Sequence, residues 1–195
     1  DLGHHVEPGL PRADMPGMMR AWTDIVAVGT ALAVRGRTGG RPPRADEVEG
    51  VTRGAFAQAE TLHPTHYRQA LGEIHACGRE MAAVFDPAAG AGCDIILSAT
   101  LAEPPAAVGW FAHDTEDYVD FRTGPAGVFA YSPFCAAFNA SGQPAASVPL
   151  GQTAAGLPVG IHLGARFGDD ETLIALCAEL ERAAPWAHRL PQLHA

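Results

Sequence analysis

Three histidines in the first half of the chain have a spacing that could suit metal ligation. His63 and His66 lie three positions apart, and His75 follows on what reads as a helix. Zinc sites need three or four ligands that meet at one point. Pro64 interrupts the first pair, and no cysteine or carboxylate completes a four-ligand pattern. We therefore expect ordinary surface histidines and no metal site.

A cysteine and a histidine near the end of the chain could form a nucleophile and its base. Cys135 would attack as a thiolate, with His162 taking its proton. The neighbours Phe134, Ala136 and Phe138 are apolar, which indicates a buried thiol whose pKa is raised. The sequence therefore favours a structural cysteine at this position.

Three carboxylates, Asp114, Glu116 and Asp117, lie close together in a stretch without clear periodicity. Paired carboxylates can serve as general acid and general base. Spacing this close on a loop is more typical of a solvated acidic rim. We expect no catalytic residue among them, and at most a binding role.

Two further groups suggest binding of a small molecule. Asn139 begins a polar turn with Gly142 and Gln143, although asparagine before a turn more often bonds its own backbone. Bulky and small apolar residues on the first helix and near Cys135 could line a pocket for methylene chains, and core packing explains them equally well. The predicted binding residues are Trp22, Val28, Gly29, Phe134, Cys135 and Asn139.

The elements that must position these residues are clearest near the end of the chain. Residues 145–149 and 157–163 read as two neighbouring strands joined by a turn-forming linker, residues 151–156. In the second strand valine, isoleucine and leucine alternate with Gly160, His162 and Gly164, so one face is bulky and the other nearly bare. A bare face lets another backbone or a ligand come close. Asp169 and the acidic residues after it then predict a helix start.

The rest of the chain reads as helices, one strand and a long loop. Asp14 can cap a helix with Pro16 in its first turn, and an Asp46/Glu49 pair resembles a capping box. A short continuous apolar run predicts a buried strand. The expected elements are helices over about 14–35, 46–62 and 65–85, a strand over 94–99, a loop over 101–131 and a partly helical segment over 127–138. Residues 1–90 are thus expected to be mainly helical, and residues 91–195 to hold strands, a long loop and a terminal helix.

Composition excludes several classes of partner. The net charge of −9 arises from 22 acidic and 13 basic residues, and no basic cluster suits a phosphate backbone, so we expect no nucleic acid. No apolar run is long enough to span a membrane, and no signal peptide is visible. Four scattered cysteines without a CxxC pair favour reduced thiols and a cytoplasmic location.

Several motifs together resemble the carboxy-terminal part of the amidase signature family. The first combines Asn139, Gly142, Pro144, Ala145, Ser147 and Pro149, and is followed by Gly-Leu-Pro-Val-Gly at 156–160 and an acidic helix start. Residues 94–105 are similar to the family's strand-plus-proline segment. Residues 2–8, 75–81 and 114–118 resemble one branch more closely, the 6-aminohexanoate cyclic-dimer hydrolases. The resemblance runs from about residue 1 to about residue 190.

The resemblance implies a fold and a chemistry that this chain holds only in part. The implied fold class is α/β, a partial amidase-signature fold with a mixed β-sheet flanked by helices, and residues 1–195 would be the carboxy-terminal part of a single amidase domain. The family's chemistry uses a lysine, a bridging serine in a cis peptide and a serine nucleophile on a Gly/Ser-rich loop. All 13 basic residues here are arginine, and the four serines lie outside any such loop. We therefore expect the catalytic residues to belong to an amino-terminal half that this chain lacks.

Two functions from different classes remain open. In the first, the chain is part of an amide hydrolase acting on linear or cyclic amides such as 6-aminohexanoate cyclic dimer, inactive by itself. Its partners would be the missing amino-terminal half and a small-molecule amide substrate, with no cofactor and with a homodimer as one possible assembly. In the second, it is a non-catalytic relic or partner-binding module of the same fold. The abrupt start of the chain favours the first.

Overall fold

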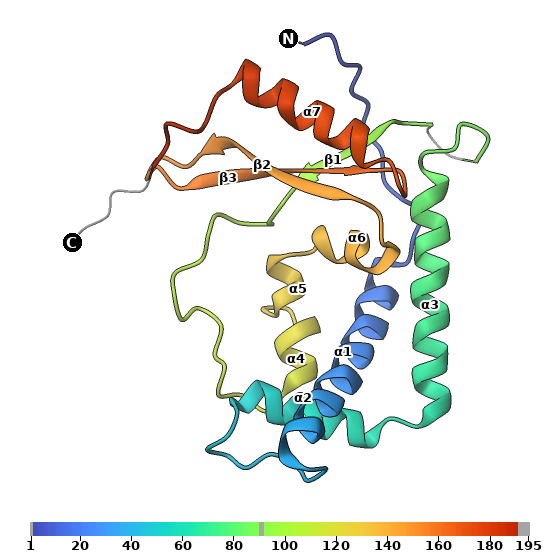
Figure 1. Cartoon of the computed structure of the whole chain (residues 1–195), viewed down its shortest axis with the longest axis vertical. Coiled ribbons are helices and arrows are strands. Elements are labelled where there is room, and N and C mark those ends of the chain that lie inside the picture. Colours follow the sequence, from blue (N-terminus) through green and yellow to red (C-terminus); the bar gives the residue numbers. More distant parts are fainter. Residues whose placement is uncertain (1, 90–91, 191–195) are drawn as a thin grey trace.

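The computed structural model describes residues 2–89 and 92–190, which form a helical block and a sheet covered on its other face by one helix (Figure 1). The chain enters the sheet at β1, returns to the helical block through a long loop between residues 100 and 117, and enters the sheet again after α6. The elements are α1 (Met15–Thr38), α2 (Gly50–Thr61), α3 (Pro64–Ala83), β1 (Ile95–Ala99), α4 (Tyr118–Thr123), α5 (Val128–Tyr131), α6 (Cys135–Ser141), β2 (Ala145–Gln152), β3 (Pro158–Ala165) and α7 (Asp170–Ala183).

The longest helix, α1, begins where the sequence predicted. Asp14 caps it, because the carboxylate oxygen Oδ1 accepts a hydrogen bond from the Gly17 N–H at 2.9 Å. Pro16 lies in the first turn, where its missing N–H is harmless. Gly39 ends the helix in the left-handed conformation, φ 71°. The cap prediction is confirmed, and the helix runs one turn further than expected.

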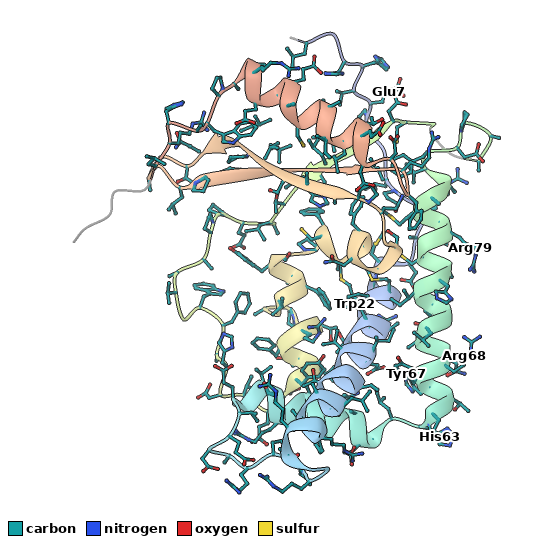
Figure 2. The ribbon with its side chains drawn as sticks, viewed as in Figure 1. Glu7, Trp22, His63, Tyr67, Arg68 and Arg79 are labelled. Carbon is teal, nitrogen blue, oxygen red and sulfur yellow. The ribbon has the colours of Figure 1, made fainter. Side chains whose placement is uncertain are left out.

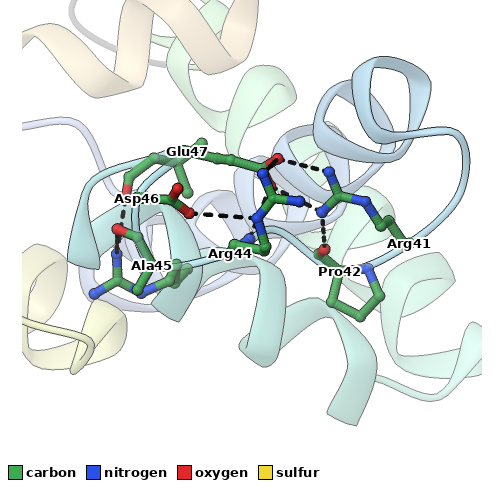
Figure 3. A network of polar contacts seen from close by, with 8 residues as sticks. Arg41, Pro42, Arg44, Ala45, Asp46 and Glu47 are labelled. Atoms are coloured by element: carbon green, nitrogen blue, oxygen red, sulfur yellow. Dashed lines mark hydrogen bonds and ion pairs between the residues drawn. The ribbon is translucent and has the colours of Figure 1, made fainter.

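The prediction that α2 begins at Asp46 is wrong, because the helix begins at Gly50. The Glu47 carboxylate accepts hydrogen bonds from the Arg41 guanidinium at 2.6 and 2.8 Å and from the Arg44 N–H at 2.9 Å (Figure 3). These bonds hold the preceding residues in a turn. The Arg41 hydrogen bond, with the Arg44 N–H, lowers the pKa of Glu47 to about 2.

The third helix, α3, packs against α1 and α6 along its buried side. His63 caps its first turn, with Nδ1 accepting from the Thr65 N–H at 3.3 Å, and Pro64 is its first residue. The shared core of these three helices is made of buried, mostly apolar side chains. They include Met18, Ala21, Ala70, Ile74, Cys77, Met81, Ala136, Ala137 and Phe138.

The sheet has the order β1-β3-β2 within the described residues, and both pairings are antiparallel. His162 in β3 lies between Ser98 in β1 and Ser147 in β2. Neighbouring residues of one register row point to the same face of a sheet. The three polar side chains therefore form a row across the face that looks toward the helical block.

The two faces of β3 differ as the alternating sequence predicted. On the bare face, a Cβ at Gly164 would overlap the Phe138 ring, and a Cβ at Gly160 would lie 2.6 Å from the hydroxyls of Thr100 and Ser147. The other face packs on α7 through side chains that include Val148, Leu163, Ala165, Leu173 and Leu176. Glycine thus lets α6 and its neighbours approach the sheet closely.

The strand predicted to be buried, β1, is an edge strand of the described sheet. It pairs only with β3 there, and Leu97 remains 53% exposed. The prediction of burial is wrong for this structure because a continuous apolar run does not distinguish a central strand from an edge strand. Cross-strand neighbours decide that, and they come from other parts of the chain.

Hydropathy along the helices gives a negative result. Among the helices within residues 2–89 and 92–190, none has the length and apolar content that a bilayer crossing would need.

Replacing Gly164 should test the close approach of α6 to the sheet. We expect Gly164→Ala to lower the free energy of unfolding by about 1–3 kcal/mol, because the added methyl overlaps the Phe138 ring. The control Gly29→Ala adds the same methyl on α1, where nothing lies within 4 Å, and should raise stability by about 0.5–1 kcal/mol. Urea denaturation followed by circular dichroism measures both, and equal midpoints for the two variants would contradict the packing described.

Candidate functional site

A hollow of about 280 Å³ lies between α6 and the bare face of the sheet. Its walls come from the residue after β1, from α6, from β2 and from β3, segments far apart in the sequence that the fold brings together. It is lined by Thr100, Cys135, Phe138, Asn139, Gln143, Ala145, Ala146, Ser147 and His162.

Hydroxyl groups make one wall of this hollow polar. Thr100 Oγ1 and Ser147 Oγ lie 2.6 Å apart in a hydrogen bond that either can donate. The Cys135 thiol donates to the Thr100 carbonyl oxygen at 3.5 Å. Cys135 is therefore tied to the backbone beside β1. Among the described residues, no hydrogen bond joins its thiol to His162, the base that the sequence offered as an alternative to a structural cysteine.

His162 is buried and faces uncharged groups. Its Nδ1 lies 3.3 Å from Ser98 Oγ, and the Phe138 ring meets it edge-on with ring centroids 4.9 Å apart. Burial lowers the pKa of His162, so the imidazole is neutral at neutral pH. The hollow consequently has polar donors and acceptors but no charged lining side chain, a combination that favours neutral polar groups such as amides over ions.

Gln143 lines the hollow and is only 6% exposed. Its Oε1 accepts a hydrogen bond from Ser141 Oγ at 2.9 Å. Its Nε2 is buried without a partner among the described residues. An unpaired buried donor costs about 1–3 kcal/mol, so this amide nitrogen is poised for an acceptor that the described residues do not supply.

The structure brings together two of the predicted binding residues. Cys135 and Asn139 both line the hollow. Trp22 packs against the helical core on α1 (Figure 2). Val28 is half-buried on α1, and Gly29 and Phe134 are exposed. These four residues lie outside the lining of the hollow, so the predicted pocket for methylene chains is not assembled from this set alone.

Sequence reasoning missed Thr100 and Ser147 as parts of the site. Ser147 lies in a predicted strand beside two alanines, and its residue type alone did not indicate a contact with the site. Thr100 follows β1 and bonds Ser147 47 positions away. No local pattern reports a contact of that separation.

The acidic residues of the long loop have structural roles. Asp117 caps α4 by accepting from the Asp120 N–H at 3.1 Å, and Glu116 forms an ion pair with Arg53 at 2.7 Å. Buried Gly50 and Gly54 in α2 leave room for the loop backbone. Asp117 and Glu116 are therefore engaged in contacts within the chain, and these contacts do not support a ligand site built from the carboxylates.

Two of the histidines whose spacing was weighed against a metal site have other partners. His63 caps α3, and His66 lies 3.0 Å from an Asp24 carboxylate oxygen. Where the structure describes the chain, no three histidine, cysteine or acidic side chains converge in a way that could hold a metal ion.

Comparison with known proteins identifies the family. The amidase family model matches residues 41–174. The chain belongs to the amidase family. The match covers the second and third helices, the long loop, α6 and the strands that form the hollow, so the candidate site is built from family sequence.

Two similar relatives are named as hydrolases. The chain is 27% identical over 197 residues to the 6-aminohexanoate-cyclic-dimer hydrolase of Paenarthrobacter ureafaciens and 28% identical to that of Pseudomonas sp. strain NK87. Each alignment covers 98% of this chain and 39% of the relative. This amidase-family chain therefore spans about 40% of the length of the curated relatives it matches.

Solved structures agree with the sequence comparison. The structure of 6-aminohexanoate cyclic dimer hydrolase complexed with substrate superposes with a TM-score of 0.75 at 26% identity, over 98% of this chain and 40% of that chain. A bacterial aryl acylamidase of the amidase signature family gives 0.69 at 22% identity, which supports the fold alone. The resemblance to this family and the predicted partial α/β amidase-signature fold are confirmed.

The buried imidazole predicts a pH dependence of stability. In the folded chain the pKa of His162 lies below the ordinary value of about 6.5. Below about pH 6.5 the unfolded chain therefore binds more protons at this residue than the folded chain does. Stability should fall as the pH falls through this window, with a slope of at most about 1.4 kcal/mol per pH unit from this residue.

Urea denaturation between pH 7.5 and 5 measures that slope. We expect His162→Gln to flatten it, and the control His75→Gln, an exposed histidine on α3, to leave it unchanged. An identical slope in wild type and His162→Gln would show that His162 is not the group responsible.

Proposed function

We propose that this chain is the carboxy-terminal portion of an amide hydrolase of the serine–serine–lysine type, acting on linear or cyclic amides such as 6-aminohexanoate cyclic dimer. We also propose that the chain is inactive alone, because it contains no lysine. The assignment to an amide hydrolase is supported by the two hydrolases that the chain resembles over 98% of its length.

The four serines of the chain give no nucleophile of the family type. Ser98 lies beside His162, Ser147 beside Thr100 and Ser141 beside Gln143. The fourth, Ser132, follows α5, where its N–H donates to the Val128 carbonyl oxygen. A serine nucleophile needs a base that takes its proton and a group that orients that base. We therefore assign the lysine and both catalytic serines to an amino-terminal portion, and to this chain the wall of the substrate site.

The chemistry of the hollow suits that role. An amide group is uncharged and offers one acceptor and one donor, and the lining supplies both kinds of partner without a charged side chain. Asn139 is exposed at its rim, where its side-chain amide can pair with an amide of the substrate. We assign Cys135 and Asn139 to substrate contact on this basis.

A cytoplasmic location is part of the proposal. Cys77, Cys93, Cys135 and Cys177 are all free thiols, as is usual in a reducing compartment.

A labelling experiment tests this division of roles. The gene product is treated with a serine-directed fluorophosphonate in extracts of its own cell. We expect a labelled serine outside residues 1–195 and release of new amine ends from 6-aminohexanoate cyclic dimer. The isolated chain should be neither labelled nor active. Heat-treated extract is the control for nonspecific labelling.

Three outcomes would overturn the proposal. The first is turnover by the isolated chain, and the second is a label on one of its four serines. The third is a native gene product of 20.4 kDa, the mass of this chain, without a co-purifying fragment. The last result would favour the non-catalytic alternative.

The role of Asn139 has its own test in the complete gene product. We expect Asn139→Ala to lower kcat/KM for the amide substrate about tenfold, by the loss of a hydrogen bond to an amide. Gln69→Ala, which truncates an exposed amide on α3, is the matched control. Equal kcat/KM values for the two variants would remove Asn139 from the site.

A further inference from the structure

A second hollow, of about 400 Å³, lies between α3, α6 and the start of the segment that leads to α7. It shares only Gln143 with the hollow described above. It is lined by Ile74, His75, Gly78, Arg79, Ala82, Ala140, Ser141, Gln143 and Phe167.

Helical spacing explains how α3 supplies two kinds of wall. Ile74, Gly78 and Ala82 follow one another at intervals of four, and His75 and Arg79 form a parallel row one position on. A Cβ at Gly78 would lie 3.7 Å from the Ser141 Cα, so α3 and α6 approach closely there. The first row therefore forms an apolar floor, and the second a polar rim.

The lining of this hollow contains a positively charged side chain and no negatively charged one. Arg79 carries a permanent positive charge and only N–H groups, and no ion pair or hydrogen bond joins it to another residue in the part of the chain that the structure describes. His75 is exposed beside it. No aspartate or glutamate lines the hollow, although the chain as a whole carries a net charge of −9.

Gln143, which lines both hollows, gives a second observation that points to a ligand. Gln143 is only 6% exposed, and Ser141 Oγ already donates to its Oε1. Its Nε2 has no acceptor among the described residues. The hollow thus combines an unpaired guanidinium with an unpaired amide donor, and lacks an anionic acceptor.

We propose that this hollow is a binding site for a small carboxylate with a short alkyl chain. The carboxylate would pair with Arg79 at the rim, since guanidinium and carboxylate match in geometry. The alkyl chain would lie on Ile74, Ala82 and Ala140 with the 70% exposed Phe167 ring beside it. A single permanent cation and an apolar floor suit this ligand better than phosphate, which prefers several cations or backbone N–H groups.

Calorimetric titration of the full chain with sodium hexanoate tests the site without any catalytic step, so its outcome is independent of the proposed hydrolase function. We expect a Kd of roughly 1 mM, as suits a ligand of about eight non-hydrogen atoms. Arg79→Gln should weaken binding about tenfold or more, because a charge-assisted pair is lost. Hexanamide, which has the same shape without the charge, should bind at least tenfold more weakly than hexanoate.

The matched control is Arg68→Gln, which removes the same charge from the same side of α3 about 16 Å along the helix, outside the hollow (Figure 2). It should leave hexanoate binding unchanged, which separates a local contact from the effect of net charge. Thermal midpoints without ligand verify that both exposed arginine variants fold.

Several results would overturn the site. They are no heat of binding up to about 10 mM hexanoate, equal binding by wild type and Arg79→Gln, and equal weakening by Arg68→Gln. Inorganic phosphate that binds as tightly as hexanoate would overturn the assignment to an alkyl carboxylate.

Discussion

The contact between the Phe138 ring and the glycine face of β3 is the constraint on which the rest of this structure depends. Phe138 belongs to the buried core of the helical block, yet its ring fills the space above Gly164 and meets His162 edge-on. A larger residue at position 164 would occupy the place of the ring. Because α6 carries Phe138, this one contact sets the distance between helices and sheet.

The position of α6 in turn creates a hollow on each of its sides. Toward the sheet lies the uncharged hollow with Cys135 and Asn139, and toward α3 lies the donor-rich hollow with Arg79. Gly142 ends α6 with φ 75°, which turns the chain so that Gln143 lies between the two. The two hollows differ in charge because one is walled by strand residues with small or hydroxyl side chains and the other by a helix surface.

Membership of the amidase family gives these hollows a context. The chain spans about 40% of the relatives that it matches and has arginine at every basic position. Arginine keeps its proton and cannot serve as the neutral base that a lysine provides. We propose that these residues shape and polarise a site, by burial of a neutral imidazole and by the Thr100–Ser147 hydroxyl pair, and that the reacting groups come from elsewhere.

The sequence by itself determined the elements whose signals are local. The alternation in β3, the Asp14 cap and the acidic start of α7 depend on neighbours a few positions away, so each could be predicted, as could the family. Only the structure decided the rest: α2 begins late because Arg41 bonds Glu47, six positions away, β1 lies at an edge, and Thr100 meets Ser147 across 47 positions. The physical reason is that side-chain hydrogen bonds and cross-strand register follow no periodicity of the sequence.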